Sequence, residues 1–227
     1  MRNASINESL SLLRKLGIPI DEVIDIGVLH GTPVLMEQFP EKTHHLIEPV
    51  EDYFPVIRAN YAKIRHHLVH AAVSDANGEV LIHSAKKLGG DQISHSWITN
   101  AATASSRRVP AITLDSYISG IQSKGPYLLK VDVDGAAVPA AILRGATKTL
   151  SQCSVVVMEM TVDRFCERIA LLDAAGFDIW DLTALCYYGE CLWQFDAVCV
   201  HRSYKKIMPR LQPMHILPFE RTLWQQG

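Results

Sequence analysis

The segment VIDIGVLHG (residues 23–31) decides the fold class of this chain of 227 residues. Val23–Gly27 has the continuous apolar character of a short buried strand, and the periodic segment Thr32–Phe39, which Pro40 ends, is typical of a helix. A glycine-bearing turn between a strand and a helix lets a ligand approach the backbone closely. The sequence therefore predicts a strand–turn–helix unit with a ligand site at its turn.

The same alternation continues on both sides of this segment. Helices are expected at 5–16, 32–39, 52–63, 136–150 and 164–175, and strands at 23–27, 45–48, 67–73, 127–133 and 155–159. Repeated strand–helix units with nearly continuous apolar strands indicate an α/β fold, with a mostly parallel sheet and helices on both faces. Strands 177–182 and 192–200 have no helix between them, so that edge is expected to be an antiparallel hairpin. After a turn at Asp75–Gly78, Glu79–His83 is expected to pair back on the third strand, and Val109–Leu114 to be extended.

Three stretches lie outside this regular pattern. Residues 1–22 are expected to form an N-terminal helix packed on the domain that spans 23–200. The polar run 84–107, with few apolar anchors, predicts an irregular lid or substrate loop. The tail 201–227 has five Lys or Arg against one Glu, a net charge of 5 − 1 = +4, and three prolines. Wrapping of the domain, contact with a second subunit of a homo-oligomer, and a solvated tail all stay open for it.

Composition excludes several classes of protein. Hydrophobic residues make up 48% and charged residues 20%, as in soluble globular domains. The formal charge of 22 − 24 = −2 gives no basic field for nucleic acid. No stretch is apolar and long enough to span a membrane, and Met1–Leu16 does not resemble a signal peptide. The five cysteines are odd in number and lie in apolar runs, which favours reduced thiols and a cytoplasmic location.

The chemistry of the glycine turn favours a cationic ligand. Asp25 precedes Gly27 by two residues, and a carboxylate there would repel a pyrophosphate but attract a positive charge. Gly27 and Gly31 have the spacing G-x-x-x-G, which differs from the G-x-G-x-x-G of nicotinamide-binding folds. A nucleoside without phosphates and with a positive centre fits this turn, and S-adenosyl-L-methionine is such a molecule.

The second predicted strand ends in Glu48-Pro49. An acidic residue at that position can accept hydrogen bonds from both hydroxyls of a ribose. A solvated charge at the end of a strand is the alternative interpretation. We favour the ribose contact because Asp25–Gly31 ends the preceding strand.

The third candidate site is the segment Lys130-Val-Asp132-Val-Asp134-Gly135. On an extended strand Lys130, Asp132 and Asp134 share one face, and two adjacent carboxylates are costly to leave unpaired. A catalytic or metal-binding pair is favoured; the alternative is an ion pair of Lys130 with one Asp, plus a helix cap from Asp134. Glu159 ends the next apolar strand at the same rim, as part of the site or as a charge at the sheet end.

Taken together, these stretches resemble FkbM-type methyltransferases, a branch of the class I S-adenosylmethionine-dependent enzymes. The matching stretches are VIDIGVLHG (23–31), LIEP (46–49), AAVSDANGEV (71–80), ITLDSYI (112–118), LLKVDVDGAAVPAAILRGATKTL (128–150), VVVMEM (155–160) and AAGFDIWDL (174–182). The resemblance implies a seven-stranded Rossmann-like sheet. It also implies methyl transfer, usually to a hydroxyl of a sugar, polyketide or other natural product.

The resemblance also assigns roles by position. Asp25, Gly27 and Gly31 would line the methionine part of the donor, and Glu48, with Pro49 beside it, would hold the ribose. The adenine would be bordered by residues that end the third strand, Ala72 and Val73. The carboxylates beside the transferred methyl group would be Asp132 and Asp134.

Three features of the sequence depart from the family pattern. Asp134 stands where the family has Glu, Ala137 replaces a second acidic residue, and Val28-Leu29 replace a small residue and an Asn. The first two affect the details of deprotonation or of any metal site.

For the reaction, Asp132 or Asp134 is expected to act as general base toward a hydroxyl acceptor. A divalent cation held by Asp132, Asp134 and Glu159 is the alternative, and we prefer the metal-free version because that set has no convincing third ligand. His30, inside the glycine turn, is a further candidate base or else a side chain at the rim. His95 and Trp97, in the polar run, either close over an acceptor or lie in a surface loop.

Other functions are weaker fits to the residues. A nicotinamide-dependent oxidoreductase is disfavoured by Asp25 and by the missing G-x-G-x-x-G. A non-catalytic binding or scaffold protein with a methyltransferase fold stays open because of Asp134 and Ala137. A nucleic-acid methyltransferase is disfavoured because the sequence has no basic stripe. The expected partners are a small-molecule or glycan acceptor, without nucleic acid or membrane.

Overall fold

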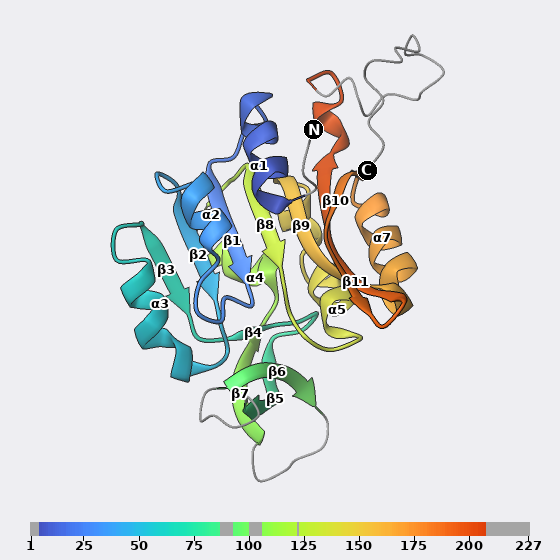
Figure 1. Ribbon diagram of the computed structural model, residues 1–227. Coiled ribbons are helices and arrows are strands. Elements are labelled where there is room, and N and C mark those ends of the chain that lie inside the picture. Colours follow the sequence, from blue (N-terminus) through green and yellow to red (C-terminus); the bar gives the residue numbers. More distant parts are fainter. Residues whose placement is uncertain (1–4, 87–92, 100–105, 122, 208–227) are drawn as a thin grey trace.

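The computed structural model describes residues 5–86, 93–99, 106–121 and 123–207, with the backbone alone for 85, 86 and 93–97. Its main sheet has seven strands in the order β10-β11-β9-β8-β1-β2-β3 (Figure 1). The bounds are β1 Glu22–Ile26, β2 Thr43–Ile47, β3 His66–Val69, β8 Tyr127–Val131, β9 Cys153–Thr161, β10 Phe177–Tyr188 and β11 Cys191–His201. The prediction of a mostly parallel seven-stranded α/β sheet is confirmed.

The order of the strands reverses at β1. This strand pairs in parallel with β2 on one side and with β8 on the other. In open parallel sheets such a reversal opens a crevice at the carboxyl ends of the strands, where ligands bind. The final two strands form the predicted antiparallel hairpin, and β11 lies next to β9 while β10 is the edge strand.

Helices cover both faces of the main sheet (Figure 1). The helices are α1 Ile6–Lys15, α2 Pro33–Gln38, α3 Phe54–Asn60, α4 Leu114–Ile121, α5 Val138–Arg144, α6 Thr147–Leu150 and α7 Phe165–Ala174, with short 3-10 turns at Glu51–Tyr53, Val162–Arg164 and Arg202–Tyr204. Leu10 and Leu13 of α1 and Leu35 of α2 pack with Val23, Leu128 and Val157. A larger core forms from Ile24, Leu129 and Val156 with Leu114, Ile142 and Leu172. Alternate residues of the buried strands thus supply both cores.

Local signals explain where several helices begin. Ser5 caps α1, because its Oγ accepts a hydrogen bond from the backbone N–H of Glu8 at 3.2 Å. Pro33 stands in the first turn of α2, where its missing N–H costs no helical hydrogen bond. Asp115 binds the start of α6, since its carboxylate accepts from the N–H groups of Lys148 at 3.0 Å and Thr149 at 2.7 Å.

A second sheet of four strands, β4-β7-β5-β6, corrects the interpretation of the middle of the chain. Its strands are β4 Ala72–Val73, β5 Gly78–Lys86, β6 Ile93–Thr99 and β7 Ser106–Ile112. The predicted third strand, 67–73, is two strands that belong to different sheets. The arm predicted at 79–83 does not return to that strand; β5 instead pairs with β6 and β7.

The polar run 84–107 is therefore not one irregular loop. It contains the end of β5, the whole of β6 and the start of β7, while 87–92 and 100–105 lie outside the described residues. His95 and Trp97 are on β6, where only the backbone is described. Because the segment is polar, its sequence gave little hydrophobic alternation from which to predict strands.

Two differences concern helices. Helix α4 was not predicted, since its eight residues follow directly on an extended segment and include a glycine. The helix predicted at 136–150 is divided into α5 and α6. The break falls at Gly145, where a Cβ would lie 2.3 Å from the backbone oxygen of Ser74. The backbone at Ser74 is thus too close to leave room for a side chain at this position.

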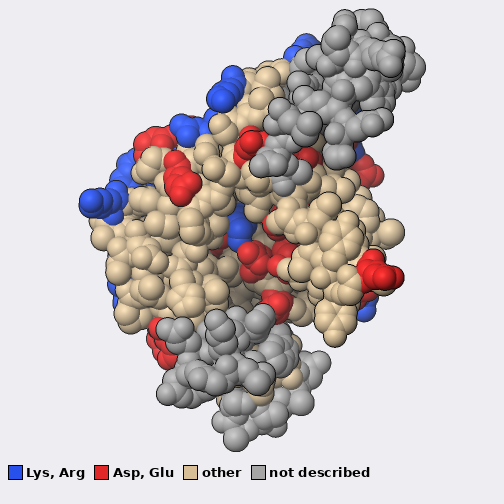
Figure 2. All heavy atoms as spheres, in the orientation of Figure 1, with Lys and Arg blue, Asp and Glu red and all other residues tan. Residues whose placement is uncertain are grey.

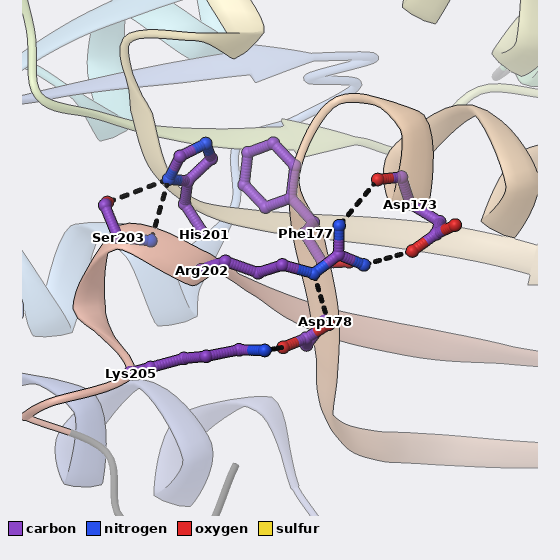
Figure 3. Close-up of polar contacts among 7 residues, drawn as sticks. All are labelled: Asp173, Phe177, Asp178, His201, Arg202, Ser203 and Lys205. Carbon is purple, nitrogen blue, oxygen red and sulfur yellow. Dashed lines mark hydrogen bonds and ion pairs between the residues drawn. The ribbon is translucent and has the colours of Figure 1, made fainter. Parts of the chain in front are cut away.

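The C-terminal end of β11 is tied to α7 and β10 by Arg202 (Figure 3). Its guanidinium donates to the carboxylates of Asp178, at 2.7 Å, and Asp173, and to the backbone oxygens of Asp173 and Phe177. Lys205 adds an ion pair to Asp178 at 3.2 Å. These contacts anchor the start of the basic tail; residues 208–227 lie outside the described part of the chain, so the open alternatives for the tail stay untested.

None of the helices among residues 5–86, 93–99, 106–121 and 123–207 has the length and apolar character needed to cross a membrane. All five cysteines are free thiols, with Cys153 and Cys199 buried and the other three exposed.

Candidate functional site

A cavity of about 270 Å³ opens at the carboxyl ends of β1, β2, β8 and β9. Figure 2 shows it as a hollow in which acidic side chains gather around a small patch of basic surface. Its lining residues come from loops and strands that are distant in sequence: Gly27, Leu29, Glu48, Pro49, Tyr53, Asp132, Val133, Asp134, Glu159 and Gln194. The site thus lies at the reversal of strand order beside β1.

Gly27 fits this position because no larger residue could occupy it. Its φ is +83°, and a Cβ would lie 1.9 Å from the backbone oxygen of Asp132. The residue two positions later, Leu29, also has a positive φ, of 53°, and its backbone N–H points to the carboxylate of Glu48 at 3.0 Å. The backbone of the turn therefore does not fill the cavity, and the space at the carboxyl end of β1 stays open.

Glu48 is almost completely buried, with 4% of its surface exposed. One carboxylate oxygen accepts from the N–H of Leu29 and the other from the N–H of Val50, at 3.0 and 2.9 Å. Burial raises its pKa to about 7, although these backbone N–H groups oppose the rise. A carboxylate has about four acceptor positions, so that of Glu48 can still accept a hydrogen bond from a ligand in the cavity.

A smaller apolar annex of about 50 Å³ continues the cavity. The two share Gly27, Pro49, Val133 and Asp134, so they adjoin. The annex is otherwise lined by apolar residues of both sheets and of α5: Ile26, Ile47, Ala71, Ala72, Val73, Ile82, Ile98, Val138 and Ile142. Ala72 and Val73, expected to border an adenine, are thus part of an apolar pocket that suits a flat ring.

Asp25 and Lys130 lie beneath the cavity. Asp25 is fully buried and is absent from the lining; neither carboxylate oxygen has a hydrogen-bond donor among the described residues. Its compensating charge is the Nζ of Lys130, 4.0 Å away. Burial raises the pKa of Asp25, and the charge of Lys130 opposes the rise. Burial also works against the charge on Lys130, but the carboxylates of Asp25 and Asp132 outweigh it and raise that pKa.

Lys130 also binds Asp132, at 2.6 Å between Nζ and Oδ2. This ion pair was the alternative interpretation of the segment 130–135. The second part of that alternative, a helix cap from Asp134, is not observed, since α5 begins after Ala137 without a side-chain cap. Asp132 and Asp134 both line the cavity, but Asp132 does so as the partner of a lysine.

The wall opposite Glu48 is acidic. Glu159, near the end of β9, lines the cavity and accepts a hydrogen bond from the Nε2 of Gln194 on β11 at 3.3 Å. Asp196 pairs with Glu159 in register across the two strands. Burial, then the charges of Asp132, Asp134 and Asp196, raise the pKa of Glu159 to about 7. Burial likewise raises the pKa of Asp196 to about 6, with Asp132 adding to the rise.

The remaining predicted residues lie at the rim. His30 is exposed and does not line the cavity; its ring meets the ring of Tyr53 edge to face, with 5.0 Å between centroids. Tyr53 itself lines the cavity, and burial raises its pKa to about 12. Gly31 lies outside the lining and against the ring of Tyr61, which a Cβ would approach to 3.2 Å.

The acidic groups do not form a metal centre by their geometry. Over the described residues, no three or more His, Cys, Asp or Glu side chains are grouped so that they could hold a metal ion. The carboxylates of the cavity wall are instead bound by Lys130 and Gln194.

Sequence reasoning missed Tyr53 and Gln194 as lining residues. Tyr53 lies in a short 3-10 turn after Glu48 and carries no motif. Gln194 reaches the cavity because β11 is inserted between β10 and β9, and this register could not be read from the order of the strands in the sequence.

A family model matches most of this chain. The model of the FkbM methyltransferase domain matches residues 25–179, more than half of the chain. A comparison with curated proteins gave no match.

Several solved structures share a distant likeness of fold. Fibrillarin of Aeropyrum pernix, with natively bound S-adenosyl-L-methionine, has 10% identity and a TM-score of 0.46 over 78% of this chain. Fibrillarin of Methanococcus jannaschii, a pre-rRNA processing protein, has 13% identity and a TM-score of 0.47 over 80% of this chain. The chain spans 66% of the length of each. A TehB-like methyltransferase of Corynebacterium glutamicum has 11% identity and a TM-score of 0.38, over 85% of this chain and 87% of that chain.

Proposed function

Because the chain belongs to the family of FkbM methyltransferases, which take their methyl group from S-adenosyl-L-methionine, we propose that it methylates a hydroxyl of a sugar or other natural product. The observation that carries this proposal is the cavity at the reversal of strand order, with a buried carboxylate, an apolar annex and an acidic wall around one space. Each part matches a different portion of a phosphate-free cationic nucleoside.

The donor half of the site consists of Gly27, Glu48 and the annex. The oxygens of Glu48 are fixed by two backbone N–H groups, and the carboxylate can still accept a hydrogen bond from a ribose. The apolar annex beside Ala72 and Val73 suits an adenine ring, because an uncharged flat ring gains from leaving water there. Because Gly27 has no side chain, the cavity leaves room for a ligand to lie over the end of β1.

Asp25 contributes from below the cavity and does not touch it. Its buried charge, shared with Lys130, adds to a negative potential in the site, as do the carboxylates of Asp132, Asp134 and Glu159. A negative potential favours a cationic donor over a phosphorylated nucleotide. When bound, S-adenosyl-L-methionine supplies an activated methyl carbon on a positively charged sulfur, so the protein has to align the acceptor, exclude water and take up a proton.

The acceptor side is bordered by the hairpin of β10 and β11. Strand β9 ends at Thr161, which pairs with Gln194. The residues between Gln194 and the turn of the hairpin therefore have no partner in β9 and extend beyond its end. Tyr188 and Trp193, in this extension, are 82% and 55% exposed, and their rings lie 6.5 Å apart. Exposed aromatic groups of this kind are typical of a binding surface. Their faces suit the C–H face of a sugar or the flat body of another natural product.

The first test is donor binding by calorimetry with S-adenosyl-L-homocysteine, S-adenosyl-L-methionine and NADH. We expect the two adenosyl compounds to bind and NADH not to bind. The second test incubates the protein with donor labelled in its methyl group and a panel of glycosides and polyketides, and detects O-methylated products by mass. Turnover of a hydroxyl acceptor supports the proposal; binding without turnover across the panel contradicts it and favours a non-catalytic binding protein.

A further inference from the structure

We propose that Glu159 is the general base that takes the proton from the acceptor hydroxyl. This assignment rests on the proposed function, since it needs an acceptor that is methylated on oxygen. It replaces Asp132, which the sequence alone favoured together with Asp134 and His30.

The contacts of the carboxylates in the cavity distinguish the candidates. Asp132 is bound by the ammonium group of Lys130 at 2.6 Å, so one of its oxygens is already held by a strong donor. That oxygen is occupied by an existing hydrogen bond. Glu159 accepts a hydrogen bond from the neutral amide of Gln194 at 3.3 Å, and it lies within hydrogen-bond reach of the carboxyl group of Asp132, which raises its pKa. Among the described residues Glu159 forms no ion pair with a cation, and the amide of Gln194 holds its orientation.

The position of Glu159 also fits the role. It lies on β9 at the carboxyl edge of the sheet, between Asp132, which follows β8, and Asp196 on β11, and it lines the cavity. His30 does not line the cavity. Asp134 does line it, and is therefore the residue against which Glu159 has to be tested.

Charged groups surround Glu159 on each neighbouring element. The acidic ones are Asp132, Asp134 and Asp196, and they disfavour a further negative charge on Glu159. Lys130 lies beyond Asp132, and Arg168 of α7 donates at 3.2 Å to the backbone oxygen of Glu159. Because burial and these carboxylates raise the pKa of Glu159 to about 7, it can take and release a proton at neutral pH.

In the step proposed for Glu159, the O–H bond of the acceptor breaks while its oxygen forms a bond to the methyl carbon. The proton moves to a carboxylate oxygen of Glu159, and the electron pair of the broken carbon–sulfur bond stays on the donor sulfur. The acidic form of Glu159 then loses its proton to solvent, so the carboxylate is restored and no oxidant or reductant is needed.

The test compares Glu159→Gln, Glu159→Asp and Asp134→Asn with Glu37→Gln, a matched control on an exposed residue of α2. With an acceptor from the panel, we expect Glu159→Gln to lower kcat by about 10²–10⁴-fold and to lose the rise of kcat with pH. Glu159→Asp should keep that rise at a lower rate, Asp134→Asn should lose less than Glu159→Gln, and Glu37→Gln should match the wild type. Affinity for S-adenosyl-L-homocysteine should stay within about threefold in Glu159→Gln, because that variant keeps the contact with Gln194.

A second readout needs no acceptor. Infrared spectra of protein labelled with ¹³C-glutamate, wild type minus Glu159→Gln, should show a carboxyl group that titrates near pH 7. The proposal is overturned if this group titrates in the ordinary acidic range, or if Glu159→Gln keeps the kcat of the wild type. If the wild type methylates nothing in the panel, the proposed function fails and this assignment fails with it; an active wild type beside an active Glu159→Gln rejects the base alone.

Discussion

The backbone oxygen of Asp132 lies where the side chain of any residue larger than glycine at position 27 would begin. A Cβ at Gly27 would be 1.9 Å from that oxygen, and the φ of Gly27 is +83°. The two residues follow the adjacent parallel strands β1 and β8, and the N–H of Asp132 donates to the oxygen of Ile26 at 3.0 Å. The floor of the cavity is thus set by two backbones in contact.

Gly27→Ala should therefore disturb the site directly. We expect affinity for S-adenosyl-L-homocysteine to fall more than tenfold, because either the turn or the segment after β8 has to move. The control is Gly120→Ala on α4, where no atom lies within 4 Å of a new Cβ. Calorimetry on both variants is the measurement, and equal affinity in the two would contradict the account of the floor.

Lys130 should be important for stability as well as for the site. Lys130→Met leaves Asp25 and Asp132 without their cation, and removing one partner of a buried ion pair costs about 3–5 kcal/mol. The loss should grow as pH rises above the ordinary value of 3.8 for Asp25, because its carboxyl group then has to ionise unpaired. Urea unfolding at pH 5 and pH 8 measures this.

A double variant gives the control for Lys130. Lys130→Met with Asp25→Asn removes the buried charge together with its partner, so it should be more stable than Lys130→Met alone. A double variant that is no more stable than the single one would show that Asp25 is not the group that needs Lys130.

Glu159→Gln should change the pH dependence of stability. The pKa of Glu159 is raised from 4.5 to about 7, so the folded state binds more protons than the unfolded state between these values. Stability of the wild type therefore falls as pH rises through this window, and the variant lacks this contribution. Relative to the wild type, Glu159→Gln should gain stability between pH 4.5 and 7 in urea unfolding. A difference that does not depend on pH would contradict the raised pKa.

Arg202 should stabilise the end of the sheet. It donates to Asp178, Asp173 and the oxygen of Phe177, and its side chain is 35% exposed, so solvent weakens these ion pairs (Figure 3). Arg202→Ala should lower the free energy of unfolding by about 1–2 kcal/mol. Arg202→Lys should recover only part, because an ammonium group lacks the planar fork. Thermal unfolding of the wild type and the two variants checks this. Equal stability of Arg202→Lys and wild type would exclude a role for the planar guanidinium group.

Trp193 should affect the acceptor and not the donor. Trp193→Ala removes an exposed ring of the hairpin, so we expect KM for a ring-bearing acceptor to rise about tenfold while affinity for S-adenosyl-L-homocysteine is unchanged. Steady-state kinetics with an acceptor from the panel is the measurement, with Ile179→Ala on the exposed edge strand as control. An unchanged KM would place the acceptor elsewhere.

Much of the site was predictable because its residues follow strands. Gly27, Glu48, Asp132 and Asp134 each stand at or just after the end of an apolar strand, and parallel strands bring such positions to one edge. The family prediction rests on the same stretches and is confirmed over residues 25–179. The roles of the individual residues in binding and catalysis stay predictions.

Other parts could not be read from the order of residues. The second sheet pairs β4 with β7 and β5 with β6, through a polar segment whose sequence lacks the alternation of strands. The insertion of β11 beside β9 brings Gln194 to Glu159 across 35 residues of sequence. Contacts of this kind depend on which strands become neighbours.

The sequence by itself determined the alternation of strands and helices, the low glycine turn and the acidic ends of the strands, because these follow from hydrophobic periodicity and from the conformational freedom of glycine. Only the tertiary structure decided which groups surround each carboxylate of the cavity. Lys130 binds Asp132, while Glu159 meets an amide and three other carboxylates, and the pKa of Glu159 depends on such neighbours across space.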